Sequence, residues 1–219
     1  PAAMTRIFGH DAHFQSFAKA MASGRLHHGW ILAGPRGVGK AGFAQEAARM
    51  LVDPENRYAS MVDHHTHPDI IWVQRLPKEA PKEGESADPD AELKRSIAID
   101  QIRSVQHSLT TRPSMGPKRV VIIDAADDLE RGGANALLKS LEEPPVGTYF
   151  MLVSHASDRL LPTIRSRCQV MRFEALGDAE MQQALLQALP QASTSEVDAL
   201  VRSGRGLPGQ AMMLAGMDF

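Results

Sequence analysis

The chain is poor in several features that define specialised classes of protein. It has one cysteine, Cys168, so a disulfide framework is excluded and a reducing compartment, the cytoplasm, is expected. It has no apolar run near the roughly 20 residues that cross a bilayer and no signal-peptide pattern, so no membrane partner is expected. Its net charge is only −2, which gives no overall basic field of the kind that attracts nucleic acid.

What remains is an ordinary globular composition. Of 219 residues, 43% are hydrophobic and 23% are charged, which suits one large α/β domain followed by a small second domain. Local motifs, rather than bulk properties, must therefore indicate the function.

A glycine-rich loop stands out near the N-terminus. An apolar run at 30–33 precedes it, and apolar residues at helical spacing follow it from Phe43 to Leu51. This order of strand, glycine loop and helix is the context of a phosphate-binding loop, whose backbone N–H groups attract phosphate oxygens while its lysine reaches the terminal phosphates. The loop consists of Gly34, Pro35, Arg36, Gly37, Val38, Gly39, Lys40 and Ala41.

The last position of this loop departs from the motif. A Walker A loop ends in serine or threonine, because the hydroxyl binds Mg²⁺, whereas Ala41 has no ligand atom. The loop is therefore expected to hold ATP weakly or not at all, with Mg²⁺ only if the nucleotide binds.

A second nucleotide motif lies downstream. Residues 119–124 form an apolar strand that ends in Asp124, which is the Walker B arrangement for holding Mg²⁺ through water. The next residue is Ala125, where many such ATPases have a glutamate that orients the attacking water. Asp127 and Asp128 are interpreted as the start of a helix.

Further apolar runs predict the remaining strands at 70–73, 149–153 and 169–173. In a parallel sheet, ligands bind at the carboxyl ends of the strands. Ser154, which follows the run at 149–153, is therefore expected near Asp124 and the glycine loop.

Helical patterns account for most of the rest. The chain predicts a helix at 11–23 that ends at Gly24. Asp100 and Asp178 are predicted to cap two later helices. The segment 75–96, rich in proline, glycine and both charges, predicts a solvated, mobile insertion. Other helical patterns lie at 134–143, 195–203 and 210–214, and residues 53–67 are expected to be irregular.

Two groups of histidines raise the question of a site. His64, His65 and His67 crowd one loop, where they cannot easily converge on one metal ion, so no metal site is predicted. His27 is interpreted as part of a polar loop. For His28 a role as the lip of an adenine pocket stays open.

Two arginines precede the last strand. Arg165 and Arg167 lie at its N-terminal end, on the sheet edge opposite the glycine loop. They cannot serve their own loop, but an arginine supplied in trans stabilises phosphate charge in a neighbour's site. Cys168, beside them, is interpreted as a packed residue rather than a reactive thiol.

Four segments together carry a resemblance to the clamp-loader branch of the AAA+ ATPases. The resemblance covers nearly the whole chain and implies a P-loop AAA+ domain at 1–173. Its five-stranded parallel sheet has the order 5-1-4-3-2, and a three-helix lid domain follows at 174–219. The family's C-terminal collar domain is absent from this sequence, so a monomeric fragment is expected. The four segments are Gly34–Lys40, the strand ending at Asp124, Asn135–Pro145 and Leu160–Cys168.

Within this family the departures favour a non-hydrolysing subunit. A tau/gamma-type motor subunit, the alternative, would have serine or threonine at Ala41, glutamate at Ala125 and an arginine near Gly209. The cysteine cluster that binds zinc in related subunits is missing here, although His67 and Asp69 remain from the same segment, so zinc is not expected.

The resemblance also implies partners and roles. The chain would belong to the DNA polymerase III holoenzyme, a nucleotidyltransferase complex. There it would act beside tau/gamma motor and delta subunits to load a sliding clamp onto primed DNA. Arg167 would be its catalytic contribution, given in trans to a motor subunit's ATP site. Ser154 falls at the sensor-1 position of a degenerate nucleotide site.

Overall fold

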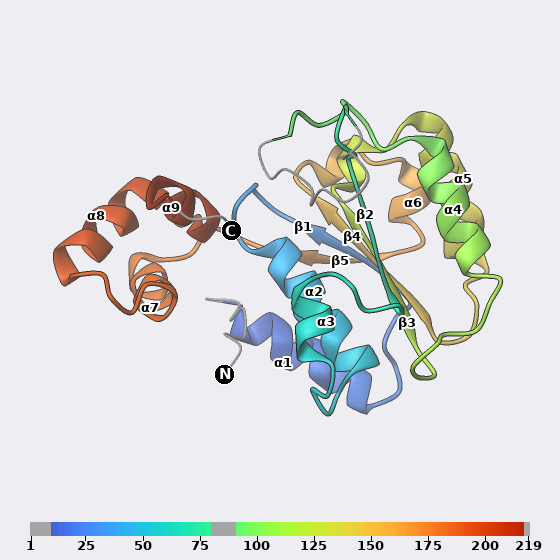
Figure 1. Ribbon diagram of the computed structural model, residues 1–219, viewed down its shortest axis with the longest axis horizontal. Coiled ribbons are helices and arrows are strands. Elements are labelled where there is room, and N and C mark those ends of the chain that lie inside the picture. Colours follow the sequence, from blue (N-terminus) through green and yellow to red (C-terminus); the bar gives the residue numbers. More distant parts are fainter. Residues whose placement is uncertain (1–9, 80–90, 217–219) are drawn as a thin grey trace.

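The computed structural model describes residues 10–79 and 91–216 (Figure 1). Five parallel strands form one sheet in the order β2-β3-β4-β1-β5, so the predicted sheet and strand order are confirmed. No helix in the described part of the chain has the length and apolarity that crossing a membrane requires. The strands are β1 (Gly29–Ala33), β2 (Ile70–Gln74), β3 (Arg119–Asp124), β4 (Thr148–Ser154) and β5 (Gln169–Arg172).

The inner strands are apolar except at their ends, because helices cover both faces of the sheet. Every residue of β1 is buried, and Val120–Ile123 of β3 are fully buried. Parallel strands covered on both sides need such continuous apolar runs, which is why the sequence pattern located them well.

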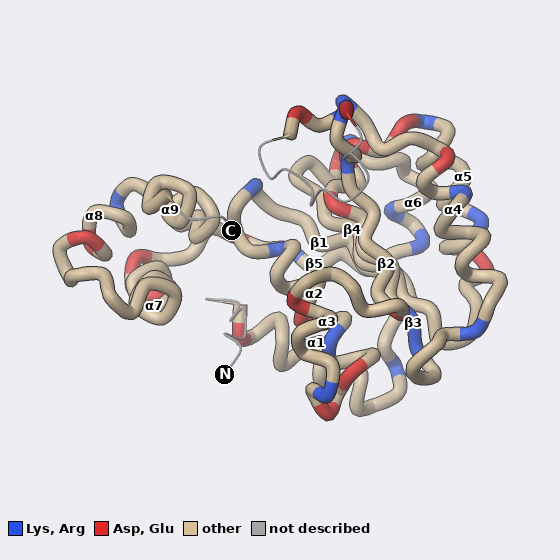
Figure 2. Tube along the Cα trace, in the orientation of Figure 1, with Lys and Arg blue, Asp and Glu red and all other residues tan. Residues whose placement is uncertain are grey.

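The helices divide between the two faces. Apolar side chains of α1, α2 and α3 pack on one face, and those of α4, α5 and α6 pack on the other. Figure 2 shows basic and acidic residues interspersed around the sheet and its helices. The helices are α1 (Asp11–Ala22), α2 (Lys40–Val52), α3 (Ala59–Asp63), α4 (Ile99–Ser108), α5 (Arg131–Glu142), α6 (Pro162–Arg165), α7 (Asp178–Ala188), α8 (Thr194–Gly204) and α9 (Pro208–Leu214), with short 3-10 turns η1 (Ala126–Asp128) and η2 (Ser157–Arg159).

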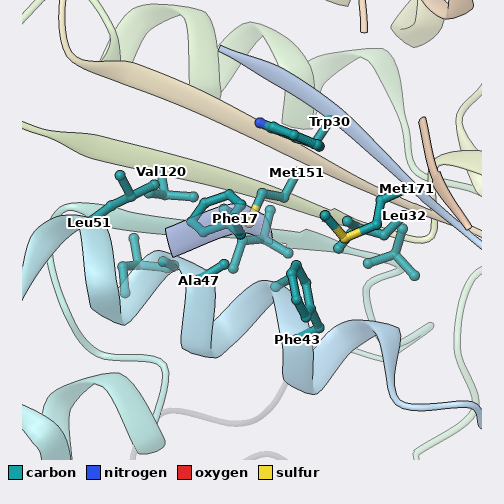
Figure 3. Packing of buried hydrophobic residues seen from close by; sticks show 14 of the residues in the cluster. Phe17, Trp30, Leu32, Phe43, Ala47, Leu51, Val120, Met151 and Met171 are labelled. Carbon is teal, nitrogen blue, oxygen red and sulfur yellow. The ribbon is translucent and has the colours of Figure 1, made fainter. Parts of the chain in front are cut away.

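Phe43 of α2 belongs to the apolar cluster on the first face (Figure 3). It is fully buried, and its ring lies 4.4 Å from that of Phe14 and 5.1 Å from that of Phe173, measured between centroids. This aromatic group joins α1, α2 and the end of β5. The helix that follows the glycine loop is thereby fixed against the sheet.

Two helix starts differ from the predictions. The residues that precede α4 and α7 are Ala98 and Gly177, so Asp100 and Asp178 are not the caps. Instead, the backbone N–H of Ala98 donates to the side chain of Gln101, three residues on, at 3.2 Å. The acidic residues lie in the first turn, where they still favour the positive end of the helix dipole.

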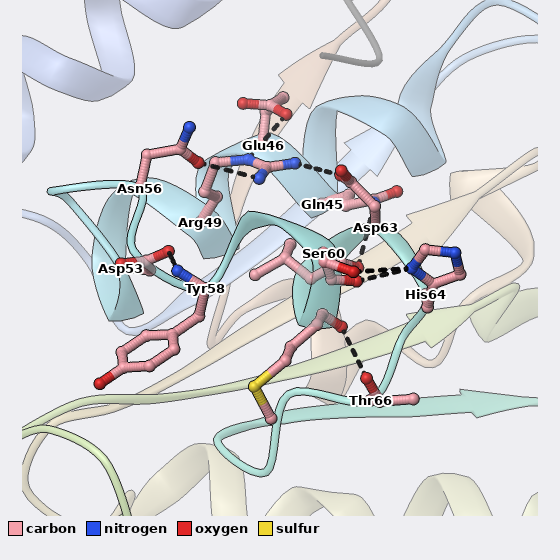
Figure 4. A network of polar contacts seen from close by, with 12 residues as sticks. Gln45, Glu46, Arg49, Asp53, Asn56, Tyr58, Ser60, Asp63, His64 and Thr66 are labelled. Atoms are coloured by element: carbon pink, nitrogen blue, oxygen red, sulfur yellow. Dashed lines mark hydrogen bonds and ion pairs between the residues drawn. The ribbon is translucent and has the colours of Figure 1, made fainter. Parts of the chain in front are cut away.

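The segment at 53–67, predicted to be irregular, contains the short helix α3 (Figure 4). Arg49 of α2 holds this segment. Its side chain is almost fully buried and donates to Asp63 at 2.6 Å and to Asn56 at 3.2 Å, besides a 3.0 Å ion pair with Glu46. A local pattern could not indicate α3, because a side chain from another helix stabilises its position.

The predicted insertion lies partly outside the described residues, which exclude 80–90. Its described flanks are largely exposed, but they pair with each other instead of forming irregular coil. Pro77 and Leu93 form an antiparallel bridge, and the backbone N–H of Lys78 donates to the carbonyl of Glu92 at 2.7 Å. The described flanks are therefore solvated as predicted, and the mobility of the segment from 75 to 96 stays a prediction.

Helices α7, α8 and α9 follow the last strand and enclose an apolar cluster of their own. Gly204 allows α8 and α9 to approach closely, since a Cβ atom at this glycine would lie 2.8 Å from the Cβ of Ala211. The division of the chain into two domains at residue 173 stays a prediction.

We expect Phe43→Ala to destabilise the protein by about 3–5 kcal/mol, because the neighbouring aromatic rings cannot move in to fill the cavity that the missing ring leaves. Urea unfolding followed by circular dichroism measures this loss. Val146→Ala is the control, since Val146 is 99% exposed and its truncation should change the free energy of unfolding by less than about 0.5 kcal/mol. Equal effects of the two substitutions would contradict the packing described.

Candidate nucleotide site and trans-acting arginine

The glycine loop connects the carboxyl end of β1 to α2. Gly37 and Gly39 have φ angles of 81° and 104°, which residues with side chains rarely adopt. Between them, Val38 is fully buried in the core below the loop. The glycines therefore serve the backbone path that the motif predicts.

Lys40 closes the loop on itself. Its ammonium group donates to the carbonyl of Gly34 at 2.7 Å and to that of Pro35 at 2.6 Å, and the residue is 3% exposed. Burial lowers the pKa of Lys40 to about 8, while the negative charge of Asp124 opposes this shift. To reach a phosphate group, the ammonium would have to give up both carbonyls.

Two further contacts brace the loop from outside. His10, just before α1, contacts the Val38 carbonyl with Nε2 at 2.7 Å, and Nε2 must be the donor because a carbonyl only accepts. On the other side, the backbone N–H of Gly209 in α9 donates to the Gly37 carbonyl at 2.8 Å. Burial lowers the pKa of His10. Sequence reasoning missed His10, because no local pattern connects it with a loop about thirty residues away.

Asp124 lies beside Lys40, as predicted, at the end of β3. Burial raises the pKa of its carboxyl group, and the positive charge of Lys40 opposes this shift. Ala41 lies in the first turn of α2 and has no ligand atom, and Ala125 is buried and has no carboxylate. The structure therefore brings the predicted loop and Asp124 together.

Asp127 and Asp128 lie in the single 3-10 turn η1, so the predicted helix start is present but short. Asp127 also makes contacts that the sequence pattern did not indicate. Its carboxylate accepts from the hydroxyl of Ser154 at 2.9 Å and from the backbone N–H of His155 at 2.7 Å. The next long helix begins only at Arg131, and Asp128 pairs with Arg75 at 3.1 Å. Ser154 thus lies near the loop as predicted, but it is held by a carboxylate that the sequence pattern had assigned to another role.

A cavity of about 490 Å³ opens next to Asp127. Three arginines line it: Arg36 from the glycine loop, Arg131 at the start of α5 and Arg159 in η2. Within residues 10–79 and 91–216, none of their guanidinium groups forms an ion pair. Two carboxylates, Asp127 and Asp128, also line the cavity, and Asp128 is paired with Arg75. The three arginines therefore leave an excess of positive charge in the wall, which the small net charge of the chain does not reveal.

His28 lies far from an adenine-binding position, so that alternative was wrong. His27 and His28 precede β1, whereas the glycine loop follows its other end. His28 Nε2 contacts the carbonyl of Leu141 at 2.9 Å, and the two imidazole rings stack with centroids 4.4 Å apart. Both histidines pack locally at the amino-terminal edge of the sheet.

The second histidine group is dispersed among separate partners. His65 stacks on Trp72 with ring centroids 4.0 Å apart, and His64 contacts the carbonyl of Ser60. His67 is buried, and its Nδ1 accepts from the backbone N–H of Asp69 at 3.1 Å. Among the described residues, no three His, Cys, Asp or Glu side chains are arranged to hold a metal ion.

Arg167 lies just before β5, at the edge of the sheet opposite the glycine loop. Its Nη2 forms an ion pair with Glu142 at the end of α5, and its Nη1 donates to the Thr163 carbonyl at 2.8 Å. About a third of the side chain remains exposed. Beside it, burial raises the pKa of the Cys168 thiol to about 12, and the residue packs against the second apolar cluster.

Comparison with known proteins places this chain in a family. Residues 9–177 match the family model described as DNA polymerase III, delta subunit. The chain is 32% identical over 198 residues to DNA polymerase III subunit delta-prime of Pseudomonas aeruginosa, an alignment that covers 86% of this chain and 56% of the relative. It is 30% identical over 213 residues to the Escherichia coli delta-prime subunit, covering 92% of this chain and 58% of that one.

The chain thus spans somewhat more than half the length of the delta-prime relatives that it matches. Subunit gamma/tau of Mycobacterium tuberculosis is 28% identical over 214 residues, covering 95% of this chain and 36% of the relative.

Among solved structures, the Thermotoga maritima RuvB branch migration motor superimposes with a TM-score of 0.60 at 15% identity. That superposition covers all of this chain and 67% of RuvB, and it shows the fold alone. The chain belongs to the delta-prime family of bacterial DNA polymerase III subunits, in the clamp-loader branch of the AAA+ fold that its motifs predict.

Proposed function

We propose that this protein is a clamp-loader subunit that does not hydrolyse ATP and instead donates Arg167 to the ATP site of a neighbouring motor subunit. The observation that carries the proposal is the contrast between the two edges of the sheet. At one edge Lys40 is bound to its own loop, and at the other edge Arg167 is partly exposed. The partners proposed are tau/gamma-type motor and delta subunits, the sliding clamp and primed DNA.

The composition of the nucleotide site supports the absence of hydrolysis. Phosphoryl transfer depends on a metal ion held by a hydroxyl and a carboxylate, and on a residue that orients the attacking water. Ala41 and Ala125 replace two of these groups. Asp127 cannot take the place of the missing glutamate, because Ser154 and two backbone N–H groups already occupy its oxygens.

The position of Arg167 supports a role in trans. The glycine loop and Asp124 follow the carboxyl ends of β1 and β3, whereas Arg167 precedes β5, which runs parallel to β1. The length of the sheet therefore separates Arg167 from its own nucleotide site. A guanidinium at a subunit edge can stabilise the charge of a phosphate held by the adjacent chain.

The alternative is a hydrolysing motor subunit of the tau/gamma type. The similarity to gamma/tau relatives extends along 95% of this chain, so the fold itself suits either role. The site composition favours the first proposal, since restoring a motor would require both a metal-binding hydroxyl and a water-orienting carboxylate.

The arginine-lined cavity supports a contact with nucleic acid phosphates. Arg131 is the first residue of α5, where the helix dipole disfavours a cation and favours an anion. A backbone phosphate beside Arg36, Arg131 and Arg159 would compensate this charge. Contacts of this kind position a protein on DNA without reading its sequence.

The isolated protein should release no phosphate from ATP above the level of a Lys40→Ala variant. The wild type and the variant both lack the groups that bind the metal ion and orient the attacking water, so removing the lysine should not change the rate of hydrolysis. Steady-state phosphate release under excess Mg²⁺ measures this. Turnover clearly above the Lys40→Ala level would support the motor alternative and contradict the proposal.

Arg167→Ala should lower the ATP turnover of the reconstituted complex and leave folding intact. An arginine finger contributes on the order of 10³-fold or more to the rate at its site. ATP hydrolysis at the site that receives Arg167 should therefore nearly stop, and the complex should lose the share of turnover that this site contributes.

Arg165→Ala is the matched control. This neighbouring arginine is 42% exposed and lies 3.8 Å from Asp158, with no contact to Glu142. It should leave turnover unchanged, and circular dichroism melting should be similar for both variants. Unchanged turnover of Arg167→Ala would contradict the trans role.

Arg131→Ala should weaken the binding of primed DNA by the complex about equally for all sequences. Because one phosphate contact is lost, the slope of log K against log salt should decrease in magnitude by about 1. A salt titration of DNA affinity checks this, with Arg103→Ala as the control, since Arg103 pairs with Asp100 on α4. An unchanged slope would contradict the phosphate contact.

A further inference from the structure

The proposed trans-acting arginine is bound by its own chain. Its Nη1 donates to the Thr163 carbonyl at 2.8 Å and contacts the Ser166 hydroxyl at 3.3 Å, while Nη2 pairs with Glu142. In the described part of the chain, Nε has no acceptor. The guanidinium is therefore fixed on one side and retains free N–H groups on another.

Glu142 is the only charged member of this arrangement besides Arg167. It is the last residue of α5, directly after the buried Leu141, so its position is set by the helix rather than by a loop. A carboxylate at the carboxyl end of a helix is disfavoured by the helix dipole, and the guanidinium of Arg167 offsets this. Both side chains therefore have a physical reason to stay together before any neighbour arrives.

We propose that Glu142 is a positioning residue, which holds the Arg167 guanidinium in the orientation that docks on the neighbour's nucleotide. The proposal rests on the trans role of Arg167 and adds the residue that prepares it. An arginine side chain loses much rotamer freedom when it is immobilised at an interface. A side chain already held by Glu142, Thr163 and Ser166 loses less of that freedom when the neighbour arrives, so docking is favoured.

The chain offers a matched control next to Glu142. Glu143 is also exposed and follows the same helix, but it forms no ion pair among the described residues. Glu142→Gln and Glu143→Gln therefore remove the same charge from adjacent positions, and only the first removes the contact with Arg167.

The test uses the full-length protein in a complex reconstituted with its motor subunits. We define the Arg167-dependent turnover as the part of ATP hydrolysis that Arg167→Ala abolishes. Glu142→Gln should lower this part about two- to five-fold, the range that a partly exposed ion pair supports. Glu143→Gln should leave it unchanged. Raising the salt concentration should narrow the gap between Glu142→Gln and the wild type, because salt screens the pair.

The double variant separates positioning from a structural role. In the Arg167→Ala background, Glu142→Gln should have no further effect on turnover, since the residue would act only through Arg167. An equal loss in both backgrounds would overturn the proposal and indicate a general effect on α5. Equal turnover of Glu142→Gln and the wild type, or faster turnover, would also overturn it. If Arg167→Ala itself had no effect, the trans role and the positioning role would fail together.

Discussion

The parallel pairing of β3, β4 and β1 is the constraint on which the rest of this structure depends. Its register places Ala33 beside Ser154 and Asp124 beside Val153, so the segments that follow these strands leave the sheet at one edge. Helices bury both faces of the strands, which restricts polar side chains to the strand ends. The polar side chains of the strands are therefore confined to two opposite edges of the sheet.

The two edges differ in how many of the N–H groups of their charged side chains have hydrogen-bond partners within the chain. At the carboxyl edge, Lys40 donates to its own loop, and His10 and Gly209 hold the loop from two sides. At the amino edge, Arg167 is held by neighbours on one side and exposed on another. The ammonium group of Lys40 is hydrogen-bonded within its own loop, whereas Arg167 keeps N–H groups without an acceptor in the described part of the chain. This difference is the physical basis of the proposal that this chain contributes an arginine to a motor subunit's site and does not hydrolyse ATP itself.

Local sequence patterns located most of the elements but not the partners of their polar groups. The strand at 119–124 was predicted with its observed bounds, since a strand buried on both faces must be apolar throughout. The contact between Asp127 and Ser154 was not predicted, because Ser154 lies at the end of another strand. The short helix α3 was missed for a similar reason, since Arg49 of α2 fixes it through side-chain contacts.

The sequence by itself located the strands and the glycine loop, because apolar runs and turn residues are properties of neighbouring residues. Its motifs also carried the family resemblance, and that resemblance implied the order of the strands in the sheet. Only the tertiary structure decided that Lys40 closes its own loop, that His28 lies away from the nucleotide edge and that Glu142 meets Arg167. Each of these depends on contacts between segments distant along the chain or on the direction in which a side chain leaves its element. Periodicity along the sequence carries no information about either.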